Sequence, residues 1–174
     1  MKELILGGAR SGKSALAERL ALQSAGKVIY LATATAGDGE MSERIRQHQQ
    51  RRPAHWLLVE EPIQLAETLQ RHAGGDTTIL VDCLTLWLSN LLAAETDSLF
   101  VQQRTALLET LPALPGRILF VSNEVGMGIV PMGELARRFV DEAGRLHQEL
   151  AQICDRVTMV VAGLPQVFKG EPLE

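Results

Sequence analysis

The stretch that decides the fold is ELILGGARSGKS, residues 3–14. Its last eight residues fit the pattern G-x-x-x-x-G-K-[ST]; they follow an apolar run of strand length and precede a helical pattern. Glycines let such a loop curl so that successive backbone N–H groups point at phosphate oxygens, and the helix turns its positive amino end toward the same anion. Lys13 can reach the β- and γ-phosphates, and the Ser14 hydroxyl can ligate Mg²⁺.

This stretch therefore predicts a phosphate loop that binds a nucleoside triphosphate. The alternative is a chance match in a glycine-rich turn. The motif indicates the ligand but not the reaction. The candidate nucleotide-binding residues in it are Gly7, Gly8, Ala9, Arg10, Ser11, Gly12, Lys13 and Ser14.

Apolar runs of strand length recur along the chain and alternate with helical patterns. The runs are rich in Val, Ile and Leu and show no polar alternation, which indicates a sheet buried on both faces and therefore parallel. We expect strands at Glu3–Leu6, Lys27–Ala32, Thr78–Asp82, Arg117–Ser122 and Arg156–Ala162. We expect helices at Ser14–Ser24, Pro62–His72 (with Pro62 at a first helical position), Leu84–Ala94, Ser98–Leu111 and Gly133–Cys154. This order predicts an α/β doubly wound fold, one domain over residues 1–174 with a mostly parallel sheet flanked by helices.

Composition fits one ordinary globular domain. Of the 174 residues, 46% are hydrophobic and 22% are charged, and the formal net charge of −4 disfavours a general nucleic-acid binder. The sequence has no apolar window long enough to span a membrane and no secretory signal, so we expect a cytoplasmic protein. Cys83 and Cys154 both lie in apolar contexts, which favours buried packing residues over metal ligands or nucleophiles.

Polar residues end two of the expected strands. Asp82 closes the apolar run TILVD, where a carboxylate in phosphate-loop proteins holds the magnesium shell. The alternative for Asp82 is an N-cap of the following helix. Asn123 and Glu124 follow the run FVS, and polar residues at the carboxyl end of a strand face the ligand crevice of open α/β sheets. For these two residues, loop capping is an equal alternative.

Four of the chain's 13 arginines lie in SERIRQHQQRRPAHW, residues 42–56, and His48 sits in the middle of them. Ser42 is a possible N-cap and Pro53 ends the pattern, so we expect a short helix. Arg44 and Arg51 would share a face with His48.

Two interpretations of this segment compete. The first is a solvated basic helix face, although few apolar residues are present to anchor such a helix. The second is another phosphate site, in which the guanidinium charges lower the pKa of His48 and keep its ring neutral and nucleophilic. The same charges would hold the phosphate under attack. The second interpretation predicts nucleotidyl transfer through a phosphohistidine bond.

Four motifs together resemble one known family. They are GGARSGKS, RI-x-x-H-x-x-x-RP-x-x-W from Arg44 to Trp56, VDCLTLWLSNLL from Val81, and SNEVGMGIVP from Ser122 to Pro131. The family is the bifunctional adenosylcobinamide kinase and adenosylcobinamide-phosphate guanylyltransferase of cobalamin biosynthesis. The closing AGLPQVFKG is also similar, so the resemblance spans essentially the whole chain.

The resemblance implies two reactions. A γ-phosphoryl group from ATP or GTP moves to the hydroxyl of the aminopropanol arm of adenosylcobinamide, and GMP from GTP is then joined to the new phosphate. His48 matches the family's guanylylated histidine. The residues that match other nucleotide-contacting positions are Thr33, Ala34, Gln49, Gln50, Arg51, Arg52, Glu60 and Asp82. Ser14 and Asp82 would hold Mg²⁺, and the family implies a RecA-like fold and a homotrimer.

Two rival functions remain open at this point. A small-molecule or nucleotide kinase would use residues 44–52 as a lid or acceptor-binding helix, and it would carry no covalent nucleotide. A regulatory or motor module would show partner-dependent ATPase activity, but the sequence has no convincing switch segment.

Overall fold

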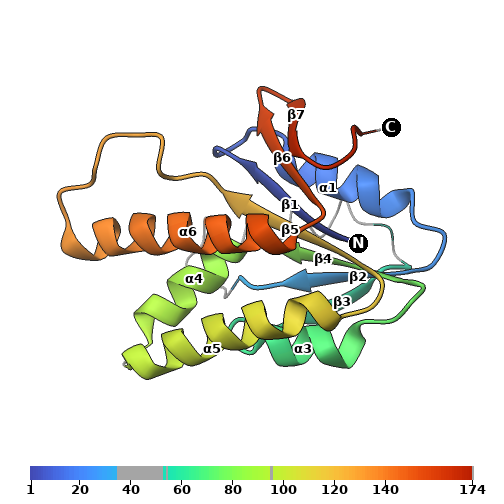
Figure 1. The fold of residues 1–174 in the computed structure, drawn as a ribbon, viewed down its shortest axis with the longest axis horizontal. Helices are drawn as coiled ribbons and strands as arrows, with labels where there is room; N and C mark the ends of the chain where they lie inside the picture. Colours follow the sequence, from blue (N-terminus) through green and yellow to red (C-terminus); the bar gives the residue numbers. More distant parts are fainter. Residues whose placement is uncertain (35–52, 54, 95, 174) are drawn as a thin grey trace.

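The computed structural model describes residues 1–34, 53, 55–94 and 96–173. Over these residues the chain forms a sheet with helices on both faces (Figure 1). The strands are β1 (Lys2–Gly7), β2 (Lys27–Ala32), β3 (Leu57–Glu60), β4 (Thr77–Asp82), β5 (Arg117–Asn123), β6 (Arg156–Val161) and β7 (Leu164–Lys169). The helices are α1 (Lys13–Leu22), α3 (Leu65–His72), α4 (Leu84–Ala93), α5 (Asp97–Thr110), the 3₁₀ turn η1 (Leu111–Ala113) and α6 (Glu134–Ile153).

The strands form one sheet in the order β3-β2-β4-β5-β1-β6-β7. Every neighbouring pair is parallel except β6 and β7, which are antiparallel. Strand β5 lies between β1, which leads into the phosphate loop, and β4, which ends in Asp82. The carboxyl ends of these three strands therefore meet at one edge of the sheet, where open α/β sheets bind ligands.

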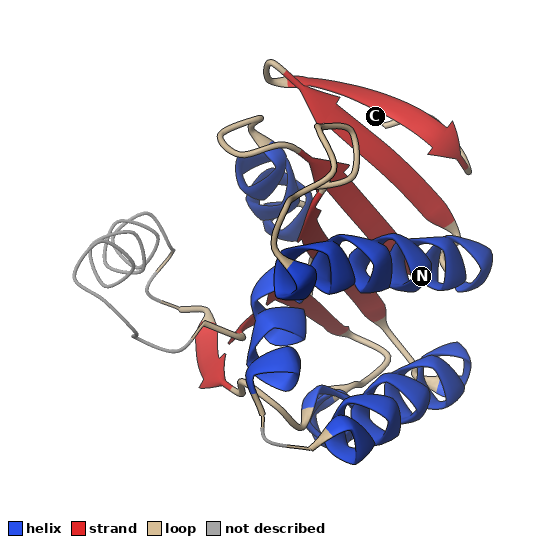
Figure 2. Cartoon of the chain, turned by 90° about the vertical axis from the view of Figure 1, so that its left-hand side faces the viewer, coloured by secondary structure: helices blue, strands red, loops and turns tan. Residues whose placement is uncertain are grey.

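Two hydrophobic cores fill the two sides of the sheet. Helix α1 covers one face, where Leu16 and Leu20 pack on Ile5, Leu80 and Val121. Helices α3, α4, α5 and α6 cover the other face (Figure 2). Burying a leucine of this kind contributes about 1.5–3 kcal/mol. Because both faces are covered, the central strands are apolar throughout instead of alternating.

The five expected strands and the five expected helices that fall on described residues are present, and their ends agree within a few residues. The short helix expected between Ser42 and Pro53 lies outside the described residues. The helix after Pro62 is the largest difference, because it begins at Leu65 and the expectation that Pro62 takes its first position is wrong. The Glu61 carboxylate instead accepts the N–H groups of Ile63 and Gln64 at 2.9 and 2.7 Å, and this turn delays the helix.

The sequence patterns did not predict the two edge strands, β3 and β7. Strand β3 has four residues, and its two leucines are each 41% exposed. Strand β7 is mostly exposed and contains Pro165, a residue that sheets tolerate at their edges. Neither strand has the buried apolar run that marks the central strands.

Both cysteines are buried and free, as expected for packing residues. Burial raises the pKa of the Cys154 thiol to about 12. Among the described residues, we find no helix whose length and hydrophobicity would let it cross a bilayer.

Candidate active site

The phosphate loop connects the carboxyl end of β1 to the first turn of α1. Gly12 has φ of 98°, a left-handed conformation that side chains disfavour, and a Cβ there would lie 3.2 Å from the Gly163 Cα. A Cβ on Gly7 would lie 2.7 Å from the Val160 carbonyl oxygen. These two glycines are therefore required by the shape of the loop and by its contact with β6. Gly8 has open space around it.

Lys13 is the basic side chain that the loop encloses. Its side chain is largely buried, with the residue 8% exposed, and its Nζ donates to the Gly8 carbonyl at 3.0 Å. Burial lowers the pKa of Lys13, and the nearby Cys83 and Asp82 groups oppose that shift. A phosphate oxygen that replaced the Gly8 carbonyl as acceptor would gain a charge-assisted hydrogen bond.

The turn between β6 and β7 supports the loop from the other side. The Gly163 N–H donates to the Ser11 carbonyl at 2.8 Å. Ala162 and Gly163 both have positive φ, 52° and 82°, as in the tight turns that close two-residue hairpins. The Ser11 hydroxyl is buried with no hydrogen-bond partner among the described residues. It is thus a polar atom in the loop that a ligand could satisfy.

Asp82 is held at the end of β4 by groups from β2. The Tyr30 hydroxyl donates to its Oδ2 at 2.6 Å, and the Thr33 N–H donates to its backbone carbonyl at 3.1 Å. The Thr33 hydroxyl is buried; it donates to the Cys83 carbonyl at 2.7 Å and accepts the Cys83 N–H at 2.9 Å. The N-cap position of α4 is Cys83, so the interpretation of Asp82 as that cap is wrong.

Asn123 ends β5 beside the first residue of the loop, since the strand register pairs it with Gly7. Its side-chain amide donates to the Thr85 hydroxyl at 2.9 Å. The Thr85 hydroxyl also lies 2.8 Å from the Cys83 sulfur, whose pKa is raised by burial. Asn123 thus links the end of β5 to the first turn of α4 through Thr85, which matches the capping alternative more than a free ligand group.

Glu124 comes next in the chain, and its N–H donates to the Gly7 carbonyl at 3.0 Å. Its Oε1 accepts the Gly126 N–H at 2.6 Å, and its Oε2 lies 3.9 Å from Nδ1 of His147 on α6. The side chain is 20% exposed. The carboxylate is therefore fixed within the phosphate-loop edge of the sheet and still open to it.

The other predicted contact residues divide into two groups. Thr33 and Ala34 follow β2 at the same edge as Asp82, and Glu60 is an exposed residue at the end of β3. The adjacent Glu61 is already engaged in its turn, which favours Glu60 as the residue available to a ligand. The second group, His48, Gln49, Gln50, Arg51 and Arg52, lies outside the described residues.

A magnesium ion would find suitable donors at this edge. Mg²⁺ prefers oxygen ligands and takes one or two protein groups together with substrate phosphates. Ser14, partly exposed in the first turn of α1, and Asp82 supply a hydroxyl and a carboxylate. No group of three or more His, Cys, Asp or Glu side chains within the described part of the chain could hold a metal by itself.

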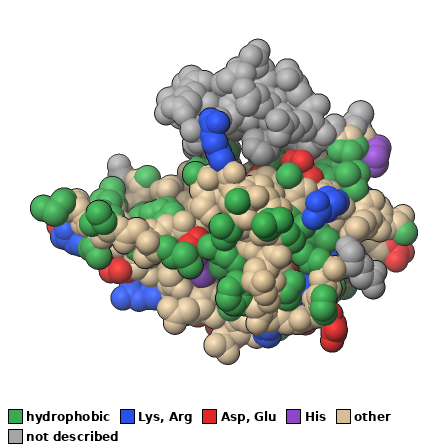
Figure 3. Space-filling view, turned by 90° about the horizontal axis from the view of Figure 1, so that it is seen from above, with side chains coloured by type: hydrophobic (Ala, Val, Ile, Leu, Met, Phe, Trp, Pro, Cys, Tyr) green, Lys and Arg blue, Asp and Glu red, His purple; other side chains and the backbone are tan. Residues whose placement is uncertain are grey.

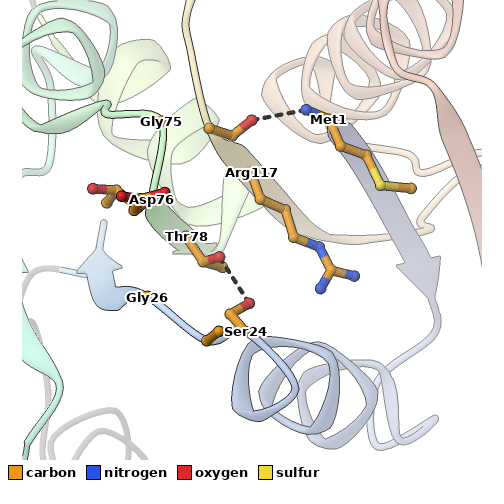
Figure 4. Close-up of a pocket in the computed structure, with 10 residues that line it drawn as sticks. Met1, Ser24, Gly26, Gly75, Asp76, Thr78 and Arg117 are labelled. Atoms are coloured by element: carbon orange, nitrogen blue, oxygen red, sulfur yellow. Dashed lines mark hydrogen bonds between the residues drawn. The ribbon is translucent and has the colours of Figure 1, made fainter.

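A separate hollow of about 620 Å³ lies at the opposite, amino-terminal edge of the sheet (Figure 4). Several of its polar groups are already bonded to protein. The Met1 ammonium donates to the Gly116 carbonyl at 2.7 Å, and the Thr78 and Ser24 hydroxyls are 2.8 Å apart. Arg117 is paired with Glu3 at 2.7 Å. This hollow has no phosphate-loop feature, so the candidate site is the carboxyl edge.

A family model described as "Cobinamide kinase / cobinamide phosphate guanyltransferase" matches residues 3–168 of this chain. The chain belongs to this family. The resemblance inferred from GGARSGKS and the three longer motifs is thereby confirmed.

Named relatives of this cobinamide kinase family member agree with the assignment. The "Bifunctional adenosylcobalamin biosynthesis protein CobP" of Pseudomonas aeruginosa is 61% identical over 173 residues, covering 99% of this chain and all of the relative. The "Bifunctional adenosylcobalamin biosynthesis protein CobU" of Salmonella typhimurium is 40% identical, covering 94% of this chain and 97% of the relative.

A solved structure confirms the fold class. The type III secretion system ATPase EscN of enteropathogenic E. coli is 16% identical, with a TM-score of 0.57 over 92% of this chain and 43% of that chain. At this identity the likeness concerns the fold alone, which is the RecA-like phosphate-loop architecture expected from the sequence.

Sequence reasoning missed three parts of the cobinamide kinase site. These are the Thr33–Cys83 hydrogen bonds, the Gly163 contact to the loop, and the Ser122–His147–Glu124 contacts that follow below. Each joins segments that are far apart in the chain. Some of these residues had a sequence signal, because Gly163 lies in the family-like run AGLPQVFKG, Cys83 in VDCLTLWLSNLL, and Ser122 and Glu124 in SNEVGMGIVP. None of these runs indicated which residue each would contact.

Proposed function

We propose that this chain phosphorylates adenosylcobinamide and then guanylylates the product in adenosylcobalamin biosynthesis. A γ-phosphoryl group from ATP or GTP is transferred to the aminopropanol hydroxyl, and GMP from GTP then joins the new phosphate with release of pyrophosphate. The observation that carries this proposal is the phosphate loop, with Lys13 enclosed in it, in a chain whose family is defined by these two activities. One domain over residues 1–174 supports both reactions.

For the kinase step, the backbone of Gly7, Gly8, Ala9, Arg10, Ser11 and Gly12 cradles the phosphates. Lys13 neutralises charge on the γ-phosphoryl group as it moves. Ser14 and Asp82 are the residues that would hold Mg²⁺, which when bound neutralises charge on the β- and γ-phosphates. The Tyr30 and Thr33 contacts support this assignment because they fix Asp82 at 2.6 and 3.1 Å from their donors.

For the guanylyl step, His48 attacks the α-phosphate of GTP and carries GMP to adenosylcobinamide phosphate. The sequence pattern Arg44, His48, Arg51 supports it, because guanidinium groups stabilise the phosphorus under attack. Gln49, Gln50, Arg51, Arg52, Thr33, Ala34 and Glu60 are the proposed contacts to the nucleotide.

The wild-type protein provides the direct test. After incubation with GTP and Mg²⁺, its intact mass should rise by one GMP group, and with adenosylcobinamide present the free product should be adenosylcobinamide-GDP. Phosphorylated adenosylcobinamide without any protein-bound GMP would instead favour the alternative, a phosphate-loop small-molecule kinase without guanylyl transfer.

Asp82→Asn tests the proposed magnesium role. If Asp82 orders the metal shell, triphosphate affinity measured with Mg²⁺ should fall by roughly tenfold or more, because one charged ligand is lost. Affinity measured with EDTA should change little. A titration of nucleotide binding against magnesium separates these cases, and an unchanged metal dependence would remove Asp82 from the metal site.

The proposed assembly is a homotrimer in the cytoplasm. Val161 at the end of β6 is 61% exposed, and Leu164 and Phe168 on edge strand β7 are each 73% exposed. Hydrophobic side chains are visible on the face of the molecule shown in Figure 3. Exposed apolar groups of this kind mark interaction surfaces. Light scattering should give three times the 19.0 kDa mass of the chain, and Phe168→Lys should lower it.

A further inference from the structure

Three polar side chains form a chain of contacts from the interior of the domain to the phosphate-loop edge. The Ser122 hydroxyl, 0% exposed on β5, lies 2.7 Å from Nε2 of His147. The other ring nitrogen of His147, Nδ1, faces the Glu124 carboxylate at 3.9 Å. None of these residues belongs to the phosphate loop or to the proposed metal site, so their arrangement requires its own explanation.

The protonation state of His147 follows from its surroundings. Burial lowers the pKa of His147, and the Glu124 charge opposes that shift, so the ring is neutral near pH 7. A neutral ring has one N–H, and an N–H at Nδ1 is favoured because it faces a carboxylate. Nε2 then accepts the Ser122 hydroxyl proton. The carboxylate of Glu124 therefore accepts the Gly126 N–H at Oε1 and faces the imidazole across 3.9 Å at Oε2.

Glu124 directly follows β5 and lies beside the start of the phosphate loop. Strand β5 is a direct neighbour of β1, and the Glu124 N–H is bonded to Gly7, the first residue of the loop. Among the carboxylates described at this edge, Asp82 is one strand further away and accepts the Tyr30 hydroxyl. Glu60 lies on the edge strand β3, with β2, β4 and β5 between it and β1.

We propose that Glu124 is the general base of the phosphoryl-transfer step. This inference rests on the proposed kinase function. The aminopropanol hydroxyl oxygen forms a bond to the γ-phosphorus, while the bond from that phosphorus to the β–γ bridging oxygen breaks. The electron pair of the broken bond stays on the departing nucleoside diphosphate. The hydroxyl proton moves to Oε2 of Glu124, the oxygen that Gly126 does not occupy, and His147 positions this carboxylate.

The two reactions of this protein differ in their need for such a base. In the kinase step the nucleophile is an alcohol, which must lose a proton as it attacks. In the guanylyl step the acceptor is a phosphate, which is already anionic near pH 7. Glu124 should therefore be required for the first reaction and not for the second.

Glu124→Gln is the variant that isolates this function. The amide oxygen can still accept the Gly126 N–H, so the loop should keep its shape, but an amide cannot take the proton. Turnover of adenosylcobinamide phosphorylation should fall by about 10²-fold or more, with KM for the triphosphate and for adenosylcobinamide unchanged. Guanylyl transfer to supplied adenosylcobinamide phosphate should stay at the wild-type rate, which also shows that the variant is folded.

Two further variants sharpen the test. Glu134→Gln removes an exposed carboxylate at the start of α6 and should leave both reactions unchanged. His147→Leu should lower kinase turnover without a change in KM, because the carboxylate loses its positioning contact. His147→Gln should recover part of that turnover, since its side-chain N–H can still point at Glu124.

Two results would overturn the assignment of Glu124. One is kinase turnover of Glu124→Gln close to that of the wild type. The other is an equal loss of both reactions together with nucleotide affinity, which would make Glu124 a structural residue of the loop. Failure of the wild-type protein to phosphorylate adenosylcobinamide would be a different outcome, because it would remove the proposed kinase function and this inference with it.

Discussion

Lys13→Met is expected to reduce kinase turnover by on the order of 10²–10³-fold, the effect of removing one group that stabilises transition-state charge. Lys13 is enclosed by the phosphate loop, with its Nζ 3.0 Å from the Gly8 carbonyl. Methionine keeps most of the aliphatic volume of this largely buried side chain, so the fold should persist. Turnover should fall more than triphosphate affinity, because negative charge shifts during phosphoryl transfer.

The measurement is steady-state phosphorylation of adenosylcobinamide, with thermal unfolding recorded in parallel. Lys27→Met provides a matched control, because Lys27 is an exposed lysine at the amino-terminal end of β2, away from the loop. It should retain wild-type turnover. Near-normal phosphorylation by Lys13→Met would show that the loop in residues 7–14 does not perform this reaction.

The central part of the fold could be predicted because its signal is local. In β4, Ile79, Leu80 and Val81 are each at most 1% exposed, and such an uninterrupted apolar run is typical of a strand whose sheet is covered on both faces. The residues of the edge strands β3 and β7 are mostly exposed. Their sequences therefore have no burial pattern to read, and only the pairing with β2 and β6 defines them.

The candidate site divides in the same way. The phosphate loop is one continuous segment whose residue types are fixed by backbone shape, as at Gly12 with its φ of 98°. Asp82 is contacted by Thr33 and by Tyr30, which is 52 positions away in the sequence. Glu124 faces His147. A sequence indicates that such polar residues exist, but the packing of helices on the sheet decides which of them meet.

The loop between β5 and α6 carries a family motif but no helix or strand. It exposes Met127, Ile129, Val130 and Met132, at 71% or more, and hydrophobic side chains gather at the corresponding end of the molecule in Figure 3. The loop starts with Glu124, directly after β5. Most of the loop lies within SNEVGMGIVP, one of the motifs that carried the family resemblance. Its hydrophobic periodicity predicted neither a helix nor a strand.

His48→Ala is expected to abolish the covalent GMP label and guanylyl transfer altogether. A histidine–phosphorus bond is a phosphoramidate, which acid breaks and alkali preserves. Protein incubated with GTP labelled at the α-phosphate should therefore carry label that acid releases. Arg51→Ala should reduce the labelling without changing its site, because the guanidinium group stabilises charge at the phosphorus but forms no bond to it.

Labelling should also slow as the pH falls below about 6.5, where a histidine protonates and ceases to be a nucleophile.

The decisive comparison lies between the two reactions of the same variant. His48→Ala should spare much of the kinase activity, because residues 7–14, Asp82 and Glu124 are the residues proposed for that chemistry. His55→Ala removes another histidine from the same stretch of sequence, an exposed one, and it should keep the label. If His48→Ala still acquires an acid-labile GMP group, His48 is not the nucleophile. The arginines around it would then be a binding face or a solvated one, because the imidazole they surround would have no phosphate to attack.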